Sequence, residues 1–179
     1  MKVAVTGASG LVGAALVKAL ERDGHVARKL VRKTPSDSSR EIHWDPAKGT
    51  IDASALEGID AVVHLAGENI AGGRWTAARK KEILDSRVRG TALIARTAAS
   101  LKKKPSVVVS ASAIGFYGDR GDEVMTEESK PGVGFLADVC KAWEGAAKPI
   151  ADAGVRLVLP RIGVVLSKNG GALQQMLTP

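Results

Sequence analysis

The stretch Thr6-Gly7-Ala8-Ser9-Gly10-Leu11-Val12-Gly13 spaces three glycines as G-x-x-G-x-x-G. An apolar run, Lys2 to Thr6, precedes it, and residues of helical apolar spacing follow it. Glycine permits a tight turn and a close approach of the backbone to a pyrophosphate, while the start of a helix offers free N–H groups to phosphate oxygens. The order of strand, loop and helix favours a dinucleotide site over an incidental glycine-rich turn. The expected cofactor-binding residues of the loop are Gly7, Ser9, Gly10, Leu11, Val12 and Gly13.

Short apolar runs alternate with longer segments of helical periodicity along the chain, which is typical of a parallel sheet with crossover helices. The expected strands are Lys2 to Thr6, His25 to Val31, Glu41 to Trp44, Ala61 to Leu65, Ser106 to Ser110 and Val155 to Pro160. One helix should follow the glycine loop, a second should span Trp75 to Leu101 and a third Phe135 to Ala153, with Pro149 as a point of kinking or early ending. The sequence therefore predicts an α/β fold with a doubly wound parallel sheet in three α/β/α layers.

The end of the second expected strand decides which nicotinamide cofactor suits the loop. A carboxylate there would accept hydrogen bonds from the ribose 2′-hydroxyl of NAD(H), whereas an arginine would pair with the 2′-phosphate of NADP(H). The strand ends Leu30-Val31-Arg32-Lys33, and the next acidic residue is Asp37. The sequence favours NADP(H) over NAD(H), with Arg32 at the phosphate. The alternative is that Arg32 and Lys33 are only solvated.

Composition excludes several classes of function. The chain has 179 residues and a net charge of +7, but its basic groups are short and lack interleaved aromatics, so a solvated surface accounts for them better than a nucleic-acid face. It shows no signal peptide and no run of about 18 apolar residues. One cysteine, Cys140, and three histidines offer no disulfide and no metal-ligand spacing. We expect a cytoplasmic protein that takes a small-molecule substrate and binds neither nucleic acid nor membrane, and homo-oligomerisation stays open.

Residues 115–134 form the longest stretch without periodicity and contain five acidic residues against two basic ones. The stretch follows the strand ending at Ser110, at the edge where ligands bind open α/β sheets. We therefore interpret it as part of the substrate side. The expected organisation is an NAD(P)-binding domain over residues 1–166, with residues 167–179 as the start of a C-terminal substrate portion that is truncated or absent.

Several segments beyond the glycine loop match one family. They are His64-Leu65-Ala66-Gly67-Glu68-Asn69-Ile70-Ala71, Gly73-Arg74-Trp75-Thr76, Ser110-Ala111-Ser112-Ala113-Ile114-Gly115-Phe116-Tyr117-Gly118-Asp119 and Phe135-Leu136-Ala137-Asp138-Val139-Cys140-Lys141-Ala142-Trp143-Glu144. These segments resemble the extended short-chain dehydrogenase/reductases, in particular the atypical "epimerase family protein" subgroup, which is similar to nucleoside-diphosphate-sugar epimerases. The resemblance implies a Rossmann-like NAD(P)-binding fold, a nucleotide sugar or carbonyl compound as substrate, and cofactor contacts from Leu65, Ala66 and Gly67.

The resemblance also implies a chemistry that this sequence lacks in part. In the superfamily a tyrosine transfers the proton, a lysine four residues later lowers the pKa of that tyrosine and holds the nicotinamide ribose, and a serine orients the substrate. No Tyr-x-x-x-Lys occurs here, and alignment on Glu144 places Leu136 and Cys140 at the two positions. The remaining catalytic candidates are Ser112, which matches the family serine, and Tyr117, the only tyrosine.

Three polar residues, Glu68, Asn69 and Arg74, follow the strand that ends at His64 and are candidates for the substrate pocket. We interpret His64 as a structural residue and Cys140 as a core cysteine. Two functional hypotheses stay open. The retained serine and the long polar loop favour an NADP-dependent epimerase or oxidoreductase with a non-standard proton donor, whereas the missing Tyr/Lys pair favours a non-catalytic NADP(H)-binding regulatory or structural module.

Overall fold

A sheet of seven strands forms the middle layer of the structure, a computed structural model that describes residues 1–177. Its strands are β1 (Lys2–Thr6), β2 (Val26–Val31), β3 (Glu41–Asp45), β4 (Thr50–Ile51), β5 (Ala61–His64), β6 (Val107–Ser110) and β8 (Arg156–Val158). Their order across the sheet is β4-β3-β2-β1-β5-β6-β8, and only the pairing of β3 with β4 is antiparallel. The direction of winding reverses at β1, which has β2 on one side and β5 on the other.

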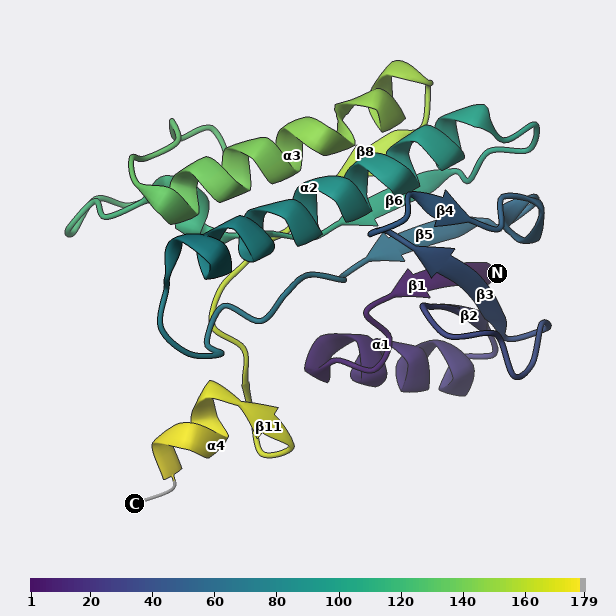
Figure 1. Ribbon diagram of the computed structural model, residues 1–179, viewed down its shortest axis with the longest axis horizontal. Coiled ribbons are helices and arrows are strands. Elements are labelled where there is room, and N and C mark those ends of the chain that lie inside the picture. Colours follow the sequence, from purple (N-terminus) through teal and green to yellow (C-terminus); the bar gives the residue numbers. More distant parts are fainter. Residues whose placement is uncertain (178–179) are drawn as a thin grey trace.

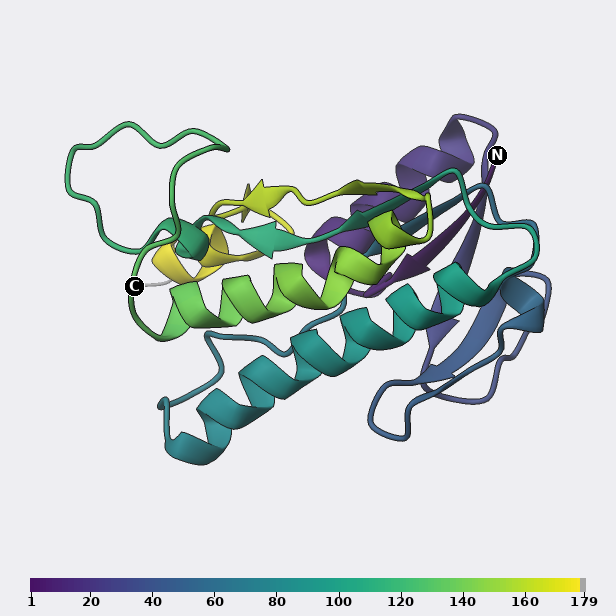
Figure 2. The same ribbon diagram turned by 90° about the horizontal axis from the view of Figure 1, so that it is seen from above.

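Helices cover both faces of the sheet and complete three layers. The helix α1 (Leu11–Arg22) lies on one face, while α2 (Ala77–Ser100) and α3 (Phe135–Asp152) run side by side on the other (Figure 1, Figure 2). The predicted doubly wound fold is therefore confirmed. Thr76 caps α2, because its side chain accepts a hydrogen bond from the N–H of Arg79. Pro149 lies in the last turn of α3 and does not end the helix early.

All six expected strands belong to the sheet, with ends that shift by at most two residues. The sheet is parallel except at one edge, where β4, a strand that the sequence did not indicate, forms an antiparallel hairpin with β3. Its turn is held by Asp45, whose Oδ1 accepts hydrogen bonds from the N–H groups of Ala47 and Lys48. The connection from β2 to β3 contains no helix. Two short 3₁₀ turns, η1 (Ser54–Leu56) and η2 (Ile114–Tyr117), complete the connections of the sheet.

Two apolar cores lie on opposite faces of the sheet because side chains of a strand alternate between faces. On β1, Val3 and Val5 pack with Val17 of α1, whereas Ala4 belongs to the larger core beneath α2 and α3. In this larger core the side chains of Ile94 of α2 and Ile150 of α3 are almost fully buried. This packing fixes the carboxyl ends of β1, β5 and β6 relative to one another.

The chain after β8 returns along the carboxyl edge of the sheet. There β9 (Arg161–Ile162) pairs in parallel with β7 (Ser112–Ala113), which follows β6. The hairpin of β10 (Leu166–Ser167) and β11 (Gly170–Gly171) comes next and leads into α4 (Ala172–Leu177). Figure 1 shows this hairpin and α4 projecting from the body, on the side of the sheet that α1 covers.

Candidate functional site

The glycine loop joins β1 to α1 at the point where the sheet winding reverses. Gly7 has a φ of +67°, and a β-carbon there would lie 2.9 Å from the carbonyl carbon of Leu65, so both the conformation and the space require glycine. A β-carbon at Gly13 would lie 2.1 Å from the carbonyl oxygen of Gly7. The N-cap of α1, Gly10, provides no side-chain acceptor. The first turn of α1 therefore keeps N–H groups available to a phosphate.

A crevice of about 780 Å³ opens beside this loop. Seven of the predicted cofactor residues line it: Gly7, Ser9, Gly10, Arg32, Leu65, Ala66 and Gly67. The predicted pocket residue Glu68 also lines it, and so do residues that were not predicted as site residues, among them Lys29, Lys33, Glu41, Trp44 and Ser86. The crevice thus spans the carboxyl ends of β2, β1 and β5, which is where dinucleotides bind in doubly wound sheets.

Positive charge gathers at the β2 end of the crevice. Arg32 is exposed and forms no ion pair with any residue that the structure describes. Glu41, the acidic residue at this end of the crevice, already has partners. Its carboxylate accepts hydrogen bonds from the backbone N–H and the hydroxyl of Ser36, which lower the pKa of Glu41, and it lies 3.9 Å from Nζ of Lys33. Because Glu41 is occupied and Arg32 is free, this end of the crevice suits a phosphate better than a ribose hydroxyl.

His64 closes the floor between β1 and β5. Its Nδ1 lies 2.7 Å from Oγ1 of Thr6 and its Nε2 lies 3.1 Å from Oγ1 of Thr91. Oγ1 of Thr6 already accepts from the N–H groups of Leu65 and Ala66, so its own hydrogen is directed to Nδ1 and the imidazole carries its proton on Nε2. The contacts of His64 therefore agree with its interpretation as a structural residue. It orients the hydroxyl of Thr6, which in turn holds the backbone of Leu65 and Ala66 next to Gly7.

We expect His64 to make folding sensitive to acid. Complete burial lowers the pKa of His64 to about 4, whereas an unfolded histidine titrates near 6.5. Between these two values the unfolded chain binds a proton that the folded chain does not, so stability falls as pH decreases through this window, by about 3 kcal/mol in all. Denaturant unfolding from pH 7 to pH 4 should show a steeper loss for the wild type than for His64→Gln. Parallel pH profiles would contradict this assignment, since both proteins keep the same carboxylates.

A second polar cluster joins β7, η2, α3 and β9. Ser112 donates from Oγ to Oε1 of Glu144 over 2.6 Å, and the same carboxylate accepts two hydrogen bonds from Arg161, at 2.9 and 3.0 Å. Nη1 of Arg161 donates to the hydroxyl of Tyr117 over 2.9 Å, and the guanidinium lies 3.5 Å from the ring centre of Phe116. Hydrogen bonding to Glu144 raises the pKa of Arg161, so the guanidinium keeps its positive charge.

This cluster brings together the two catalytic candidates, Ser112 and Tyr117, which the sequence could list but not connect. The proton of the Ser112 hydroxyl is committed to Glu144, whereas the oxygen of Tyr117 accepts from Arg161 and leaves the phenolic proton free to be donated. Arg161 itself was not indicated by any motif. Its pairing with Glu144 depends on two residues 17 positions apart that meet only through the fold.

The positions aligned with the missing Tyr/Lys pair lie beside this cluster. Cys140 is buried, its Sγ lies 3.7 Å from the carbonyl oxygen of Ala113, and burial raises the pKa of its thiol. Leu136 packs against Gly115, where a β-carbon would approach Cβ of Leu136 to 3.3 Å. Cys140 is therefore a core residue, and neither position supplies a cation.

The three predicted pocket residues do not form one group. Glu68 pairs with Arg79 over 3.0 Å, and Oδ1 of Asn69 accepts from the N–H of Ala71 in its own loop. Of the three, only Glu68 lines the crevice, and Arg74 is exposed. A different arginine, Arg87 of α2, reaches this loop and donates to the carbonyl oxygen of Glu68 over 3.0 Å.

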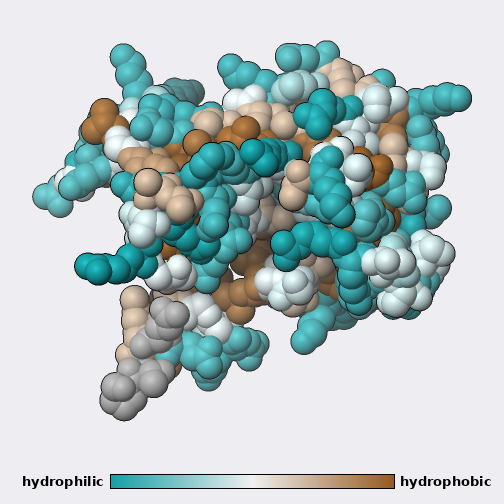
Figure 3. Space-filling model, in the orientation of Figure 1, coloured by the Kyte–Doolittle hydropathy of each residue, from teal (hydrophilic) through white to brown (hydrophobic). Residues whose placement is uncertain are grey.

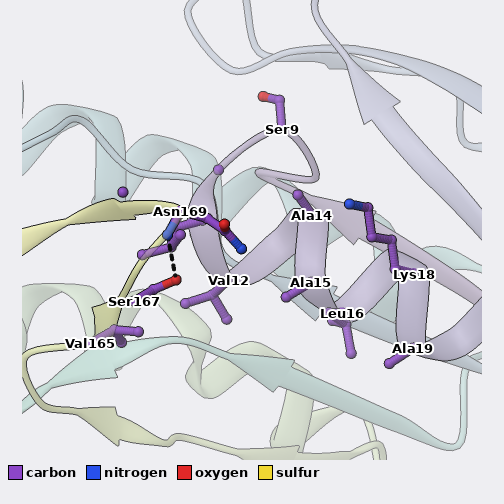
Figure 4. A pocket seen from close by; sticks show the side chains of 13 residues that line it. Ser9, Val12, Ala14, Ala15, Leu16, Lys18, Ala19, Val165, Ser167 and Asn169 are labelled. Carbon is purple, nitrogen blue, oxygen red and sulfur yellow. Dashed lines mark hydrogen bonds between the residues drawn. The ribbon is translucent and has the colours of Figure 1, made fainter. Parts of the chain in front are cut away.

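A second hollow, of about 1020 Å³, separates α1 from residues 165–170. Figure 4 shows side chains of α1 facing those of Val165, Ser167 and Asn169 across it. The predicted cofactor residues Leu11 and Val12 line this hollow and not the crevice, while Ser9 and Gly10 border both.

In the orientation of Figure 1, Figure 3 shows a largely hydrophilic surface with apolar residues in the recess beside the C-terminal segment. No helix within residues 1–177 has the length and apolar character needed to cross a membrane.

Comparisons of the sequence with known proteins identify a family and several relatives. The model of the NAD dependent epimerase/dehydratase family matches residues 3–135. An epimerase family protein of Mycobacterium bovis is 44% identical over 174 residues, which cover 97% of this chain and 57% of the relative. Epimerase family protein YfhF of Bacillus subtilis is 34% identical, over 100% of this chain and 59% of the relative. The chain thus spans somewhat more than half the length of the curated relatives it matches.

Two solved structures share the fold at appreciable sequence identity. The nucleoside-diphosphate sugar epimerase of Corynebacterium glutamicum superposes with a TM-score of 0.85 at 43% identity, covering 98% of this chain and 36% of that chain. Human epimerase family protein SDR39U1 (isoform 2), solved with NADPH, gives a TM-score of 0.88 at 33% identity, covering 100% of this chain and 59% of that chain.

Proposed function

We propose that this chain, which belongs to the NAD dependent epimerase/dehydratase family, binds NADP(H) in the crevice beside the glycine loop. The observation that carries the proposal is that an uncapped start of α1 and an unpaired Arg32 border one crevice. The backbone around Gly7 and Gly10 would hold the pyrophosphate, and Arg32 would pair with the 2′-phosphate. The human relative solved with NADPH supports the same choice of cofactor.

Charge reversal at Arg32 tests this proposal. Arg32→Glu should weaken NADPH binding about 10- to 100-fold and leave NADH binding nearly unchanged, because one charge-assisted contact becomes a repulsion. Titration of cofactor fluorescence measures both affinities. Arg96→Glu provides the matched control, since Arg96 is exposed on α2 and away from the crevice. Equal affinity of the wild-type chain for NADPH and NADH would contradict the preference.

We further propose that a small molecule reacts beside the Ser112 and Tyr117 cluster. A bound nicotinamide would supply or accept the hydride, and the chain must then move a proton to or from the substrate oxygen. Tyr117 is the proposed proton donor, because the Arg161 guanidinium holds the phenol oxygen and leaves its proton directed elsewhere. A nucleotide sugar or a carbonyl compound is the proposed substrate, and the Corynebacterium neighbour, a nucleoside-diphosphate sugar epimerase, supports the first.

A non-catalytic NADP(H)-binding module is the second candidate. It is favoured by one observation: Leu136 and Cys140 offer no acid, base or cation where the superfamily places its Tyr/Lys pair. Hydride transfer from bound NADPH to a panel of carbonyl compounds and nucleotide sugars separates the candidates. The measurement should use a full-length relative as well, because this chain spans only part of the length of its relatives. Turnover that Tyr117→Phe removes supports the enzyme, whereas tight binding without turnover supports the module.

A further inference from the structure

Arg87 is a half-buried cation without an acidic partner. It lies in the middle of α2, where Nη1 donates to the backbone oxygens of Glu68 and Ile83 at 3.0 and 3.1 Å. Its guanidinium lies 5.0 Å from the ring centre of Trp143 on α3. No carboxylate oxygen lies within 4.0 Å of it among residues 1–177. The side chain is therefore held firmly from two helices while most of its N–H groups stay unused.

Such a cation is costly unless something fills its donors. Desolvation lowers the pKa of Arg87, and the carboxylate of Glu68, which lies beyond ion-pair distance, offsets this only in part. Next to it, Trp143 is only 6% exposed, and its buried Nε1 finds no acceptor among the described residues. Two neighbouring groups thus have unfilled donors, a pattern that points to a ligand rich in oxygen acceptors.

The position of Arg87 identifies which ligand oxygens it can reach. A β-carbon on Gly67 would lie 3.4 Å from Cζ of Arg87, and Gly67 lines the crevice directly after the two residues that touch Gly7. Arg32 stands at the end of β2, on one side of β1, whereas Gly67 and Arg87 stand on the β5 side. A dinucleotide that crosses the sheet at β1 places one nucleotide on each side.

We propose that Arg87 is a cofactor-binding residue that donates hydrogen bonds to the phosphate and ribose oxygens of the nicotinamide half of NADP(H). The proposal rests on the proposed function, because it assigns the β5 side of the same crevice. Cys140, a neutral thiol, occupies the position where the superfamily has its lysine. Arg87 supplies a positive charge close to that position, from α2. The two arginines then divide the work: Arg32 binds the adenosine half and Arg87 the other half.

Two ligands of different length test this division. Adenosine 2′,5′-bisphosphate contains only the adenosine half, whereas NADPH contains both. Arg87→Met should raise the Kd for NADPH about 10-fold and change the Kd for adenosine 2′,5′-bisphosphate less than about twofold, as expected for the loss of one charge-assisted contact. Arg87→Lys should give an intermediate Kd for NADPH. Arg89→Met is the matched control on the same helix, since Arg89 is exposed and pairs with Asp85.

A spectroscopic measurement on the wild-type chain keeps the test independent of how well the variants fold. NADPH should shift the indole N–H signal of Trp143, identified with Trp143→Phe, and adenosine 2′,5′-bisphosphate should not. Unchanged NADPH affinity in Arg87→Met, or equal weakening of both ligands, would overturn the role of Arg87. A wild-type chain that binds neither ligand overturns the proposed function together with this inference, whereas normal NADPH binding with an indifferent Arg87 overturns the inference alone.

Discussion

Replacing Gly13 with alanine is expected to abolish NADPH binding at concentrations that saturate the wild type. The new β-carbon would stand 2.1 Å from the carbonyl oxygen of Gly7 and 3.0 Å from the α-carbon of Ala8, and both are backbone atoms that no side-chain rotation can move. The loop must therefore shift away from α1, at a cost of about 1–3 kcal/mol in stability and about 100-fold or more in NADPH affinity. Fluorescence titration and denaturant unfolding measure the two effects.

Gly145→Ala is the matched control for this substitution. Gly145 is also a helical glycine, in α3, but a β-carbon there would meet no atom within 4 Å. Alanine should stabilise the helix by about 0.5–1 kcal/mol because it restricts the unfolded chain and suits a helix better than glycine. NADPH binding should stay at the wild-type level. If Gly13→Ala binds NADPH as well as Gly145→Ala does, the glycine loop does not form the cofactor site.

Replacing Glu144 with alanine is expected to destabilise the chain by about 3–5 kcal/mol, because it leaves the Arg161 guanidinium in a poorly solvated place without its counter-charge. The side chains of the two residues are only 13% and 18% exposed, and the substitution also removes the acceptor of the Ser112 hydroxyl. Denaturant unfolding of the purified variant gives the free energy directly. The double variant Glu144→Leu with Arg161→Met should recover most of the loss, since it removes both charges together.

An exposed pair on the same helix provides the comparison for Glu144. Asp138 and Lys141 of α3 form an ion pair whose side chains are 65% and 42% exposed. Asp138→Ala should cost no more than about 1 kcal/mol, because water replaces the contact and only the helix start loses a favourable charge. Equal losses for Asp138→Ala and Glu144→Ala would show that the Glu144–Arg161 pair carries no special weight in the fold.

Local signals in the sequence were enough to predict the main elements. The apolar spacing of α1, α2 and α3 and the runs that became β1, β5 and β6 depend on residues close together in the chain, and the structure confirms them. The glycine loop was also readable from its spacing between a strand and a helix, and the structure shows that Gly7 and Gly13 have no room for a β-carbon. By contrast, the β3–β4 hairpin escaped notice, since β4 contributes two residues and too little periodicity to detect.

The side-chain partnerships were beyond reach for a physical reason. Thr6 and His64 are 58 residues apart, and Glu144 and Arg161 are 17 apart, so no periodic pattern links either pair. Arg87 looks in the sequence like another cation of a basic helix; its lack of an acidic partner appears only once α3 and the Gly67 loop are packed around it. Such contacts become predictable only when the fold is already known.

The acidic loop, residues 115–134, is held at its two ends and exposed between them. The N–H of Gly132 donates to the carbonyl oxygen of Phe116, a β-carbon at Gly132 would collide with the backbone of Tyr117, and Arg161 also donates to the carbonyl oxygen of Glu127. These contacts hold the two ends of the loop together, whereas its tip is exposed at Val124. Changes in the length of the tip should therefore leave the rest of the fold intact, which denaturant unfolding of a variant shortened at the tip would measure.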